Sequence, residues 1–158
     1  MSRAIPSKNF YDATSKTYQD TSLERCQYLS AIDRLVRKEL DGLKDLRLLE
    51  VGAGNGIRTS NLLSGLEYKK LLLIEESSVF ANDLSNKFKE NEFWHGAVEN
   101  YVANDDNYNL ALCLWSVINH VQDPLEFFTS INKLLDVNGI FIFDFNNRFN
   151  IKEYGVYN

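Results

Sequence analysis

The chain has 158 residues, of which 44% are hydrophobic and 25% are charged, so we expect one compact domain with a packed core rather than a disordered chain. Its net charge is −5 and its Lys and Arg residues are scattered, which argues against a nucleic-acid partner because phosphate backbones need clustered cations. A polar N-terminus, apolar runs well short of the ~20 residues that span a bilayer, and only two cysteines predict a cytoplasmic protein without membrane contact, disulfide scaffold or zinc site.

Helix-like and strand-like patterns alternate along the chain. Residues 6–18 are polar and aromatic and indicate a loosely packed helix or cap. Apolar residues at three- and four-residue steps then predict a helix from an N-cap at Ser22 to Leu40. Asp123-Pro124 is typical of a further helix start. Short apolar strands are expected at 46–51, 71–74, 93–95, 109–114 and 140–145, and helices at about 57–64, 77–89 and 124–138.

This alternation predicts an α/β fold, a three-layer sandwich in which helices cover both faces of a parallel sheet of about five strands. The strands lack a polar residue at every second position, as expected when both faces of a sheet are covered. Asn138-Gly139 is expected to end the last helix before the fifth strand. We divide the single domain into a helical cap at 1–42, an α/β core at 43–145 and a tail at 146–158.

Three glycines, Gly52, Gly54 and Gly56, follow the first expected strand. Ligands of parallel sheets bind at the carboxyl ends of the strands, and a glycine turn that opens a helix lets a ligand approach free amide groups. The third glycine comes one residue early for a dinucleotide fingerprint, and no Gly-Lys-Ser/Thr ends the loop as in a P-loop. Glu50 would repel a phosphate and attract an amine or sulfonium, although it could instead cap the helix or pair with a lysine.

A second acid, Glu75, closes the second expected strand. An acid at this place can accept hydrogen bonds from both hydroxyls of a ribose. The alternative is a solvated charge at the end of a strand, for which the neighbouring Glu76 is the better candidate. After the third strand, Gly96-Ala97-Val98-Glu99 lies where a loop can edge an adenine ring. Together these features predict a nucleoside-type ligand with a positively charged group.

The segment EVGAGNG, residues 50–56, resembles the first motif, E/D-x-G-x-G-x-G, of the class I S-adenosylmethionine-dependent methyltransferases. The resemblance runs from about Phe10 to Phe145. FYDATSKTYQD resembles the family's N-terminal cap, and GAVE resembles its G-D-A-E-like segment. LCLWSVINHVQDP resembles the segment after strand four of small-molecule methyltransferases, and LLDVNGIFIFD resembles the entry into strand five.

The resemblance implies a Rossmann-like sheet of order 3-2-1-4-5, S-adenosyl-L-methionine as cofactor, S-adenosyl-L-homocysteine as product, and methyl transfer to a small-molecule acceptor. It places Glu50 at the cofactor's methionine end and Glu75 at its ribose. Ala97 replaces an acid that often holds the adenine amino group, which leaves the backbone amide of Val98 for that contact. No metal site is expected. The residues expected to bind the cofactor are Tyr11, Tyr18, Glu50, Gly52, Ala53, Gly54, Gly56, Glu75, Glu76, Ala97, Val98, Glu99, Trp115 and Ser116.

His120 is the candidate catalytic residue, because a histidine can take a proton from an acceptor hydroxyl or amine near neutral pH. The alternative is packing or capping before the next helix. The methyl group of such a cofactor is already bound to a positively charged sulfur, so a base is needed only for a poorly ionised acceptor. Cys113 lies inside an expected strand and is predicted to be inert, which argues against methylation through a thiolate nucleophile.

The family's sheet normally has seven strands, whereas only NNRFNIKEYGVYN follows the fifth strand expected here. Residues 140–143 are apolar on both faces, and an exposed edge of this kind invites pairing. The open explanations are a truncated chain, a degenerate remnant, or an edge covered by a second copy (a homodimer) or a partner chain. Three functions also stay open: a small-molecule methyltransferase, a cofactor-binding module that acts with a partner, and, as a weaker alternative, an NAD-dependent enzyme.

Overall fold

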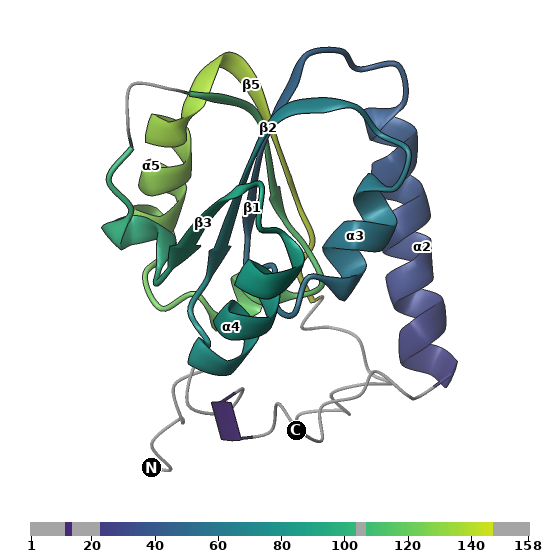
Figure 1. The fold of residues 1–158 in the computed structure, drawn as a ribbon, viewed down its shortest axis with the longest axis horizontal. Helices are drawn as coiled ribbons and strands as arrows, with labels where there is room; N and C mark the ends of the chain where they lie inside the picture. Colours follow the sequence, from purple (N-terminus) through teal and green to yellow (C-terminus); the bar gives the residue numbers. More distant parts are fainter. Residues whose placement is uncertain (1–11, 14–22, 104–106, 147–158) are drawn as a thin grey trace, which may run out of the picture.

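The computed structural model of the chain describes residues 12–13, 23–103 and 107–146. Its elements are, in chain order, α2 Leu23–Leu40, β1 Leu46–Val51, α3 Ile57–Leu63, β2 Tyr68–Glu75, α4 Ser78–Lys87, β3 Glu92–His95, η1 Val98–Asn100, β4 Tyr108–Cys113, η2 Val117–His120, α5 Pro124–Leu134 and β5 Leu135–Phe143. The described strands form one parallel sheet of order β3-β2-β1-β4-β5 (Figure 1). Both the α/β class and this strand order are confirmed, while the division into cap, core and tail stays a prediction.

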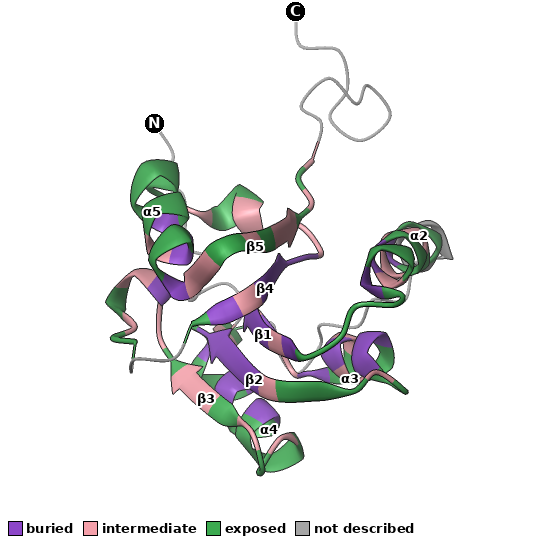
Figure 2. Cartoon of the chain, turned by 90° about the horizontal axis from the view of Figure 1, so that it is seen from above, coloured by how far each residue is buried: buried purple, intermediate pink, exposed green. Residues whose placement is uncertain are grey.

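Two hydrophobic clusters lie on opposite faces of the sheet. Val36 of α2 and Leu62 of α3 pack with Leu48 of β1 in the first cluster. Phe127 of α5 packs with Leu49 of β1 in the second. Successive residues of β1 therefore point to opposite faces, and α2 and α3 cover one face while α5 covers the other (Figure 2). Because both faces are buried, the strand is apolar at every position except Arg47 and Glu50 and lacks the alternation of a half-exposed strand, as the sequence indicated.

Two helices begin where their capping residues predicted. The Ser77 side chain accepts a hydrogen bond from the Phe80 amide at the start of α4. The Asp123 side chain accepts one from the Glu126 amide at the start of α5, and Pro124 occupies the first helical turn. These caps satisfy amide groups that have no partner within the helix. Both helices consequently start at the carboxyl edge of the sheet, beside the loops that follow the strands.

The junction between α5 and β5 differs from the sequence-based expectation. Helix α5 ends at Leu134 and β5 begins at Leu135, so the prediction that Asn138-Gly139 ends the helix is wrong. Pairing of Leu135 with Tyr108 of β4 extends the strand backward and overrides the turn signal. Asn138 instead has a φ of 67° inside β5, where the register between β4 and β5 shifts. Asparagine tolerates this left-handed backbone, which suits an irregular point of a strand.

Strand β2 also begins earlier than its apolar run at 71–74. Its first residue, Tyr68, pairs with Leu46 of β1, and Lys70 pairs with Arg47. The first two residues of β2 are exposed, so hydrophobicity alone does not mark them as a strand. Backbone pairing with β1 is what defines the start of this strand.

Strand β5 is the outer strand of the described sheet. Its Val137 is 92% exposed and its Ile140 is 45% exposed. The Phe141 and Phe143 rings lie with their centroids 5.0 Å apart, and Phe145 continues the row at 6.3 Å from Phe143. The strand is therefore apolar on both faces, as expected, and within the described residues no further strand pairs with its outer edge.

Cys113, at the end of β4, is a free and buried thiol. Burial is the main reason that its pKa is raised to about 12, with a smaller effect from the charge of Asp144. The thiol therefore stays protonated near neutral pH, which agrees with the prediction that it is inert. No helix within the described residues is long and apolar enough to cross a membrane.

Candidate functional site

The glycine loop, residues 52–56, joins β1 to α3, and each of its three glycines has a left-handed backbone. A Cβ on Gly52 would lie 2.6 Å from two methyl carbons of Val117, and a Cβ on Gly56 would lie 2.6 Å from the ring of Phe88. Nothing lies within 4 Å of the place that a Cβ on Gly54 would take. The first and third glycines thus permit close packing, whereas the middle one faces open space where a ligand can approach.

The glycine loop is fastened to the end of β2. The amides of Gly52 and Ala53 donate to the carbonyl of Ile74 at 2.8 and 3.2 Å. The Gly54 amide donates to one carboxylate oxygen of Glu75 at 2.8 Å. Glu75, expected to bind a ribose, therefore also holds the loop, which sequence reasoning did not foresee.

The second carboxylate oxygen of Glu75 accepts a hydrogen bond from the Ser77 amide at 2.8 Å. Burial raises the pKa of this carboxyl, and the two amide donors oppose that shift. A carboxylate oxygen has two lone pairs, so acceptor sites remain beside those the two amides use. Binding of a ribose by Glu75 stays a prediction, and so does a role for the neighbouring Glu76, whose side chain is exposed.

Glu50 lies in β1 with a side chain that is only 1% exposed. Neither of its carboxyl oxygens has a hydrogen-bond partner among the described residues. Burial raises the pKa of this carboxyl to about 8, the nearby Thr59 of α3 opposes the shift, and the charge of Glu75 adds to it. The Thr59 hydroxyl likewise lacks a partner of ordinary hydrogen-bond geometry within the described structure. An unpartnered buried carboxyl is costly, so this position suits a ligand with a positively charged group.

The segment after β3 lies at the same edge of the sheet. The Gly96 amide donates to the Glu75 carbonyl at 3.0 Å. Val98 is buried and begins η1, and both Ala97 and Glu99 are half-buried. The segment is therefore close to the acid expected at the ribose, as an adenine site requires, and its contact with a ligand stays a prediction.

The turn after β4, residues 115–117, completes the other side of the glycine loop through Val117. Trp115 and Ser116 have φ values of 61° and 71°, which are unusual for residues other than glycine. The Trp115 Nε1 donates to Asp33 of α2 at 2.9 Å. The Ser116 amide donates to both carboxylate oxygens of Asp144, at 3.1 and 3.0 Å. The structure thus brings Trp115 and Ser116 to the loop, but their contact with a cofactor stays a prediction.

His120 is the last residue of η2 and has an exposed side chain. Partial burial lowers the pKa of its imidazole. Its catalytic role stays a prediction. Sequence reasoning missed Asp33 and Asp144, which hold the turn after β4. Asp144 had a weak signal, because it is the one charged residue in the apolar run expected at 140–145, whereas Asp33 had none inside its helix.

The two tyrosines expected at the cofactor, Tyr11 and Tyr18, lie outside the described residues. Asp12, between them in the sequence, is described. It accepts hydrogen bonds from the hydroxyls of Ser77 at 2.6 Å and Ser78 at 3.3 Å, at the start of α4. This contact brings Asp12 close to the Glu75 carboxylate, which accepts hydrogen bonds from the amides of Gly54 and Ser77.

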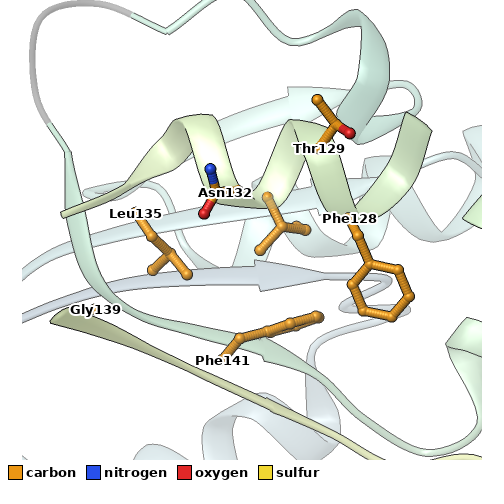
Figure 3. Close-up of a pocket in the computed structure, with 7 residues that line it drawn as sticks. Phe128, Thr129, Asn132, Leu135, Gly139 and Phe141 are labelled. Atoms are coloured by element: carbon orange, nitrogen blue, oxygen red, sulfur yellow. The ribbon is translucent and has the colours of Figure 1, made fainter. Parts of the chain in front are cut away.

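A separate hollow of about 530 Å³ lies between α5 and β5 (Figure 3). Its lining residues are Phe128, Thr129, Ile131, Asn132, Leu135, Gly139 and Phe141. The lining contains no charged side chain. It includes the first residue of β5, so it extends to the end of that strand opposite the glycine loop. It therefore lies between α5 and the face of β5 that α5 covers, apart from the site built around Glu50 and Glu75.

Comparison with known proteins agrees with this geometry. The sequence model of a protein family described as a methyltransferase domain matches residues 21–154. A ubiquinone biosynthesis O-methyltransferase of Rickettsia bellii is 28% identical over 123 residues, which cover 76% of this chain and 50% of the relative. A malonyl-[acyl-carrier protein] O-methyltransferase of Bacteroides thetaiotaomicron is 28% identical over 156 residues, which cover 97% of this chain and 58% of the relative. The chain thus spans about half the length of the curated relatives it matches.

Solved structures show the same fold. The plantazolicin methyltransferase BpumL, in complex with a pentazolic desmethylPZN analog and SAH, aligns with a TM-score of 0.72 and 16% identity over 93% of this chain and 57% of its own. The DhpI–SAM–HEP complex aligns with a TM-score of 0.66 and 17% identity over 91% of this chain and 66% of its own. At such identities the likeness shows the fold alone.

Proposed function

This chain belongs to the methyltransferase domain family, and from that premise we propose that it transfers a methyl group from S-adenosylmethionine to an oxygen of a small-molecule acceptor. The observation that carries the proposal is the buried carboxyl of Glu50, whose oxygens have no partner of ordinary hydrogen-bond geometry within the described part of the chain, beside a glycine loop whose Gly54 faces open space. The two relatives named as O-methyltransferases support an oxygen acceptor.

The residues present fit this cofactor. Glu50 would offer its carboxyl to the positively charged methionine end, where attraction offsets the cost of burying an ionised group. Glu75 would accept hydrogen bonds from the ribose hydroxyls with the acceptor sites that its two amide donors leave. The segment Ala97–Glu99 would edge the adenine. The middle of the glycine loop leaves the space that a ligand needs against the backbone.

When it is bound, the cofactor supplies a methyl group on a positively charged sulfur. The task of the chain is to hold the acceptor in line with that methyl group and to exclude water. The turn at 115–117, packed against Gly52, would form one wall of this space. His120 would take the acceptor's proton where the acceptor is poorly ionised, and its lowered pKa keeps more of the imidazole in the neutral form that accepts a proton.

The proposal is tested by calorimetric titration of the 158-residue chain with S-adenosylhomocysteine, with NAD as the control ligand. We expect S-adenosylhomocysteine to bind and NAD not to bind. Binding of NAD alone would overturn the cofactor assignment. Transfer of a labelled methyl group from S-adenosylmethionine to a panel of phenols and carboxylic acids then tests catalysis. Cofactor binding without transfer to any of them would favour a binding module that acts with a partner.

We also propose a cytoplasmic location, on grounds of composition, and self-association through the free edge of β5. The exposed Val137 and Ile140 at that edge support the second proposal, because unprotected apolar edge strands pair with other chains. A second copy is the occupant we propose, since two identical edges can pair around a two-fold axis.

A further inference from the structure

Two successive residues of the turn after β4 adopt a backbone that side chains disfavour. Trp115 has a φ of 61° and Ser116 a φ of 71°. Such a backbone is strained in a residue other than glycine, and it persists only where surrounding contacts determine it. The contacts that hold this turn therefore indicate what the site requires.

Asp144, the first residue after β5, supplies the central contact. Both of its carboxylate oxygens lie within hydrogen-bond distance of the Ser116 amide. Its own amide donates to the Cys113 carbonyl at the end of β4. The Tyr28 hydroxyl of α2 donates to the same carboxylate at 2.9 Å. Through its carboxylate and its backbone amide, Asp144 thus ties together the end of β4, the turn that follows it and helix α2.

Further hydrogen bonds hold the same turn from its other side. The Ser116 hydroxyl donates to the side-chain oxygen of Asn146 at 3.0 Å. The backbone amide of Asn146 donates to the side-chain oxygen of Asn119 at 3.1 Å. The Asn119 side chain in turn donates to the Ser116 carbonyl at 3.1 Å. These three hydrogen bonds link Ser116, Asn119 and Asn146 in a ring that holds the turn in its left-handed form.

That arrangement decides where Val117 lies. Its two methyl carbons occupy the space in which a Cβ of Gly52 would stand, at 2.6 Å. A turn that relaxed to an ordinary right-handed backbone would redirect the chain at Val117. The wall of the site that faces Gly52 would then move.

The two acids at the carboxyl edge play matching parts on the two sides of the sheet's centre. Glu75 ends β2 and binds an amide of the loop that follows the neighbouring strand β1. Asp144 follows β5 and binds an amide of the turn that follows the neighbouring strand β4. We propose that Asp144 is a positioning residue of the methyl-transfer site, which holds the Trp115-Ser116 turn in its left-handed form so that Val117 closes on Gly52. This inference rests on the proposed function.

The test measures the affinity for S-adenosylhomocysteine in Asp144→Ala, Asp144→Asn, Ser116→Gly and the double variant Asp144→Ala/Ser116→Gly. We expect Asp144→Ala to weaken binding about tenfold, the scale of one hydrogen bond to a charged group. Asp144→Asn keeps one acceptor oxygen for the Ser116 amide and should lose less. Glycine adopts the left-handed backbone without support, so Ser116→Gly in the Asp144→Ala background should recover most of the lost affinity.

Asp136→Ala is the matched control, because Asp136 is an acid near the other end of β5 and pairs with Arg47. It should leave the affinity within about twofold of the parent chain, a change that corresponds to about 0.4 kcal/mol. Unchanged affinity in a folded Asp144→Ala variant, or no recovery in the double variant, would overturn the inference. If Asp144→Ala does not fold, Asp144→Asn with and without Ser116→Gly gives the same comparison. Failure of the parent chain to bind S-adenosylhomocysteine would instead overturn the proposed function.

Discussion

Glu50 carries a carboxyl that is 1% exposed and whose pKa burial raises from 4.5 to about 8. Below pH 4.5 the group is protonated in both the folded and the unfolded chain. Between pH 4.5 and 8 the unfolded chain releases this proton while the folded chain keeps it, so the free energy of unfolding falls as pH rises. A positively charged ligand beside Glu50 would favour the ionised form and would reduce this cost.

Glu50→Gln should therefore stabilise the ligand-free chain at high pH, because an amide cannot ionise. We expect a gain on the order of 4 kcal/mol in the free energy of unfolding at pH 8, and little or none at pH 4. Urea unfolding at several pH values measures both. The same variant should bind S-adenosylmethionine more weakly, since it loses the charge that attracts the sulfonium. Equal pH dependence in the parent and in Glu50→Gln would show that Glu50 is not the titrating group.

Glu75 and Glu76 are adjacent acids with contrasting surroundings. Glu75 is buried and accepts hydrogen bonds from two amides, whereas Glu76 is exposed. Glu75→Ala should weaken binding of S-adenosylhomocysteine by about 1.5–3 kcal/mol and should also lower the melting temperature, because two amides lose their acceptor. Glu76→Ala is the control and should leave the affinity nearly unchanged. Calorimetry measures the affinity of both variants for S-adenosylhomocysteine. Equal losses of affinity in both would show that Glu75 has no special role in binding.

At the scale of elements, the contact between the glycine loop and the turn after β4 can be tested within the loop itself. Gly52→Ala places a methyl group 2.6 Å from the stiff Val117 side chain, whereas Gly54→Ala meets nothing within 4 Å. Both variants bear a similar strain from their left-handed backbone, of about 1 kcal/mol. Gly52→Ala should therefore destabilise the chain by about 2 kcal/mol more than Gly54→Ala, as measured by chemical unfolding.

Gly54→Ala should show the reverse pattern in ligand binding. A methyl group on Gly54 occupies the open side of the loop, so it should weaken S-adenosylhomocysteine binding while costing little stability. If Gly54→Ala binds the ligand as well as the parent does, the open side of the loop is not where the cofactor lies.

The sequence patterns predicted correctly those strands in which the residues paired by the backbone are also the buried, apolar ones. Strand β1 is apolar because both faces are covered, so its bounds follow from composition. The starts of β2 and β5 do not, because exposed Tyr68 and half-buried Leu135 belong to strands through backbone pairing alone. The pattern of side chains along the sequence does not reveal such backbone pairing. Asn138, a turn signal in isolation, is absorbed into a strand for the same reason.

The residues of the candidate site likewise fall into those that the sequence can predict and those that only strand pairing brings together. Glu50 and the glycine loop are contiguous in the sequence, so their spacing predicts a binding site directly. Asp144 acts on Ser116 across 28 positions of sequence, and only the pairing of β4 with β5 brings them together. Parallel sheets gather the carboxyl ends of distant strands at one edge. Polar residues directly after each apolar strand are therefore candidates that motif spacing alone overlooks.

At the scale of the whole molecule, the strands of the sheet differ in how far neighbouring elements bury them. Its central strands β1 and β4 are buried, while β5 leaves an apolar edge with a row of phenylalanine rings and the hollow beside α5. Natural edge strands are commonly blunted by lysine, proline or short length. Strand β5 has nine residues and contains neither lysine nor proline.

Val137 and Val102 allow this edge to be tested with the same substitution at two exposed positions. Both side chains are more than four-fifths exposed, at 92% and 83%, but Val137 belongs to β5 and Val102 follows η1. We expect the parent chain to show concentration-dependent dimerisation in sedimentation velocity. Val137→Lys should weaken it, because a charge buried between paired edges loses its hydration, whereas Val102→Lys should leave it unchanged. A parent chain that stays monomeric at every concentration would contradict self-association, and equal weakening by both lysines would attribute dimerisation to charge rather than to the edge of β5.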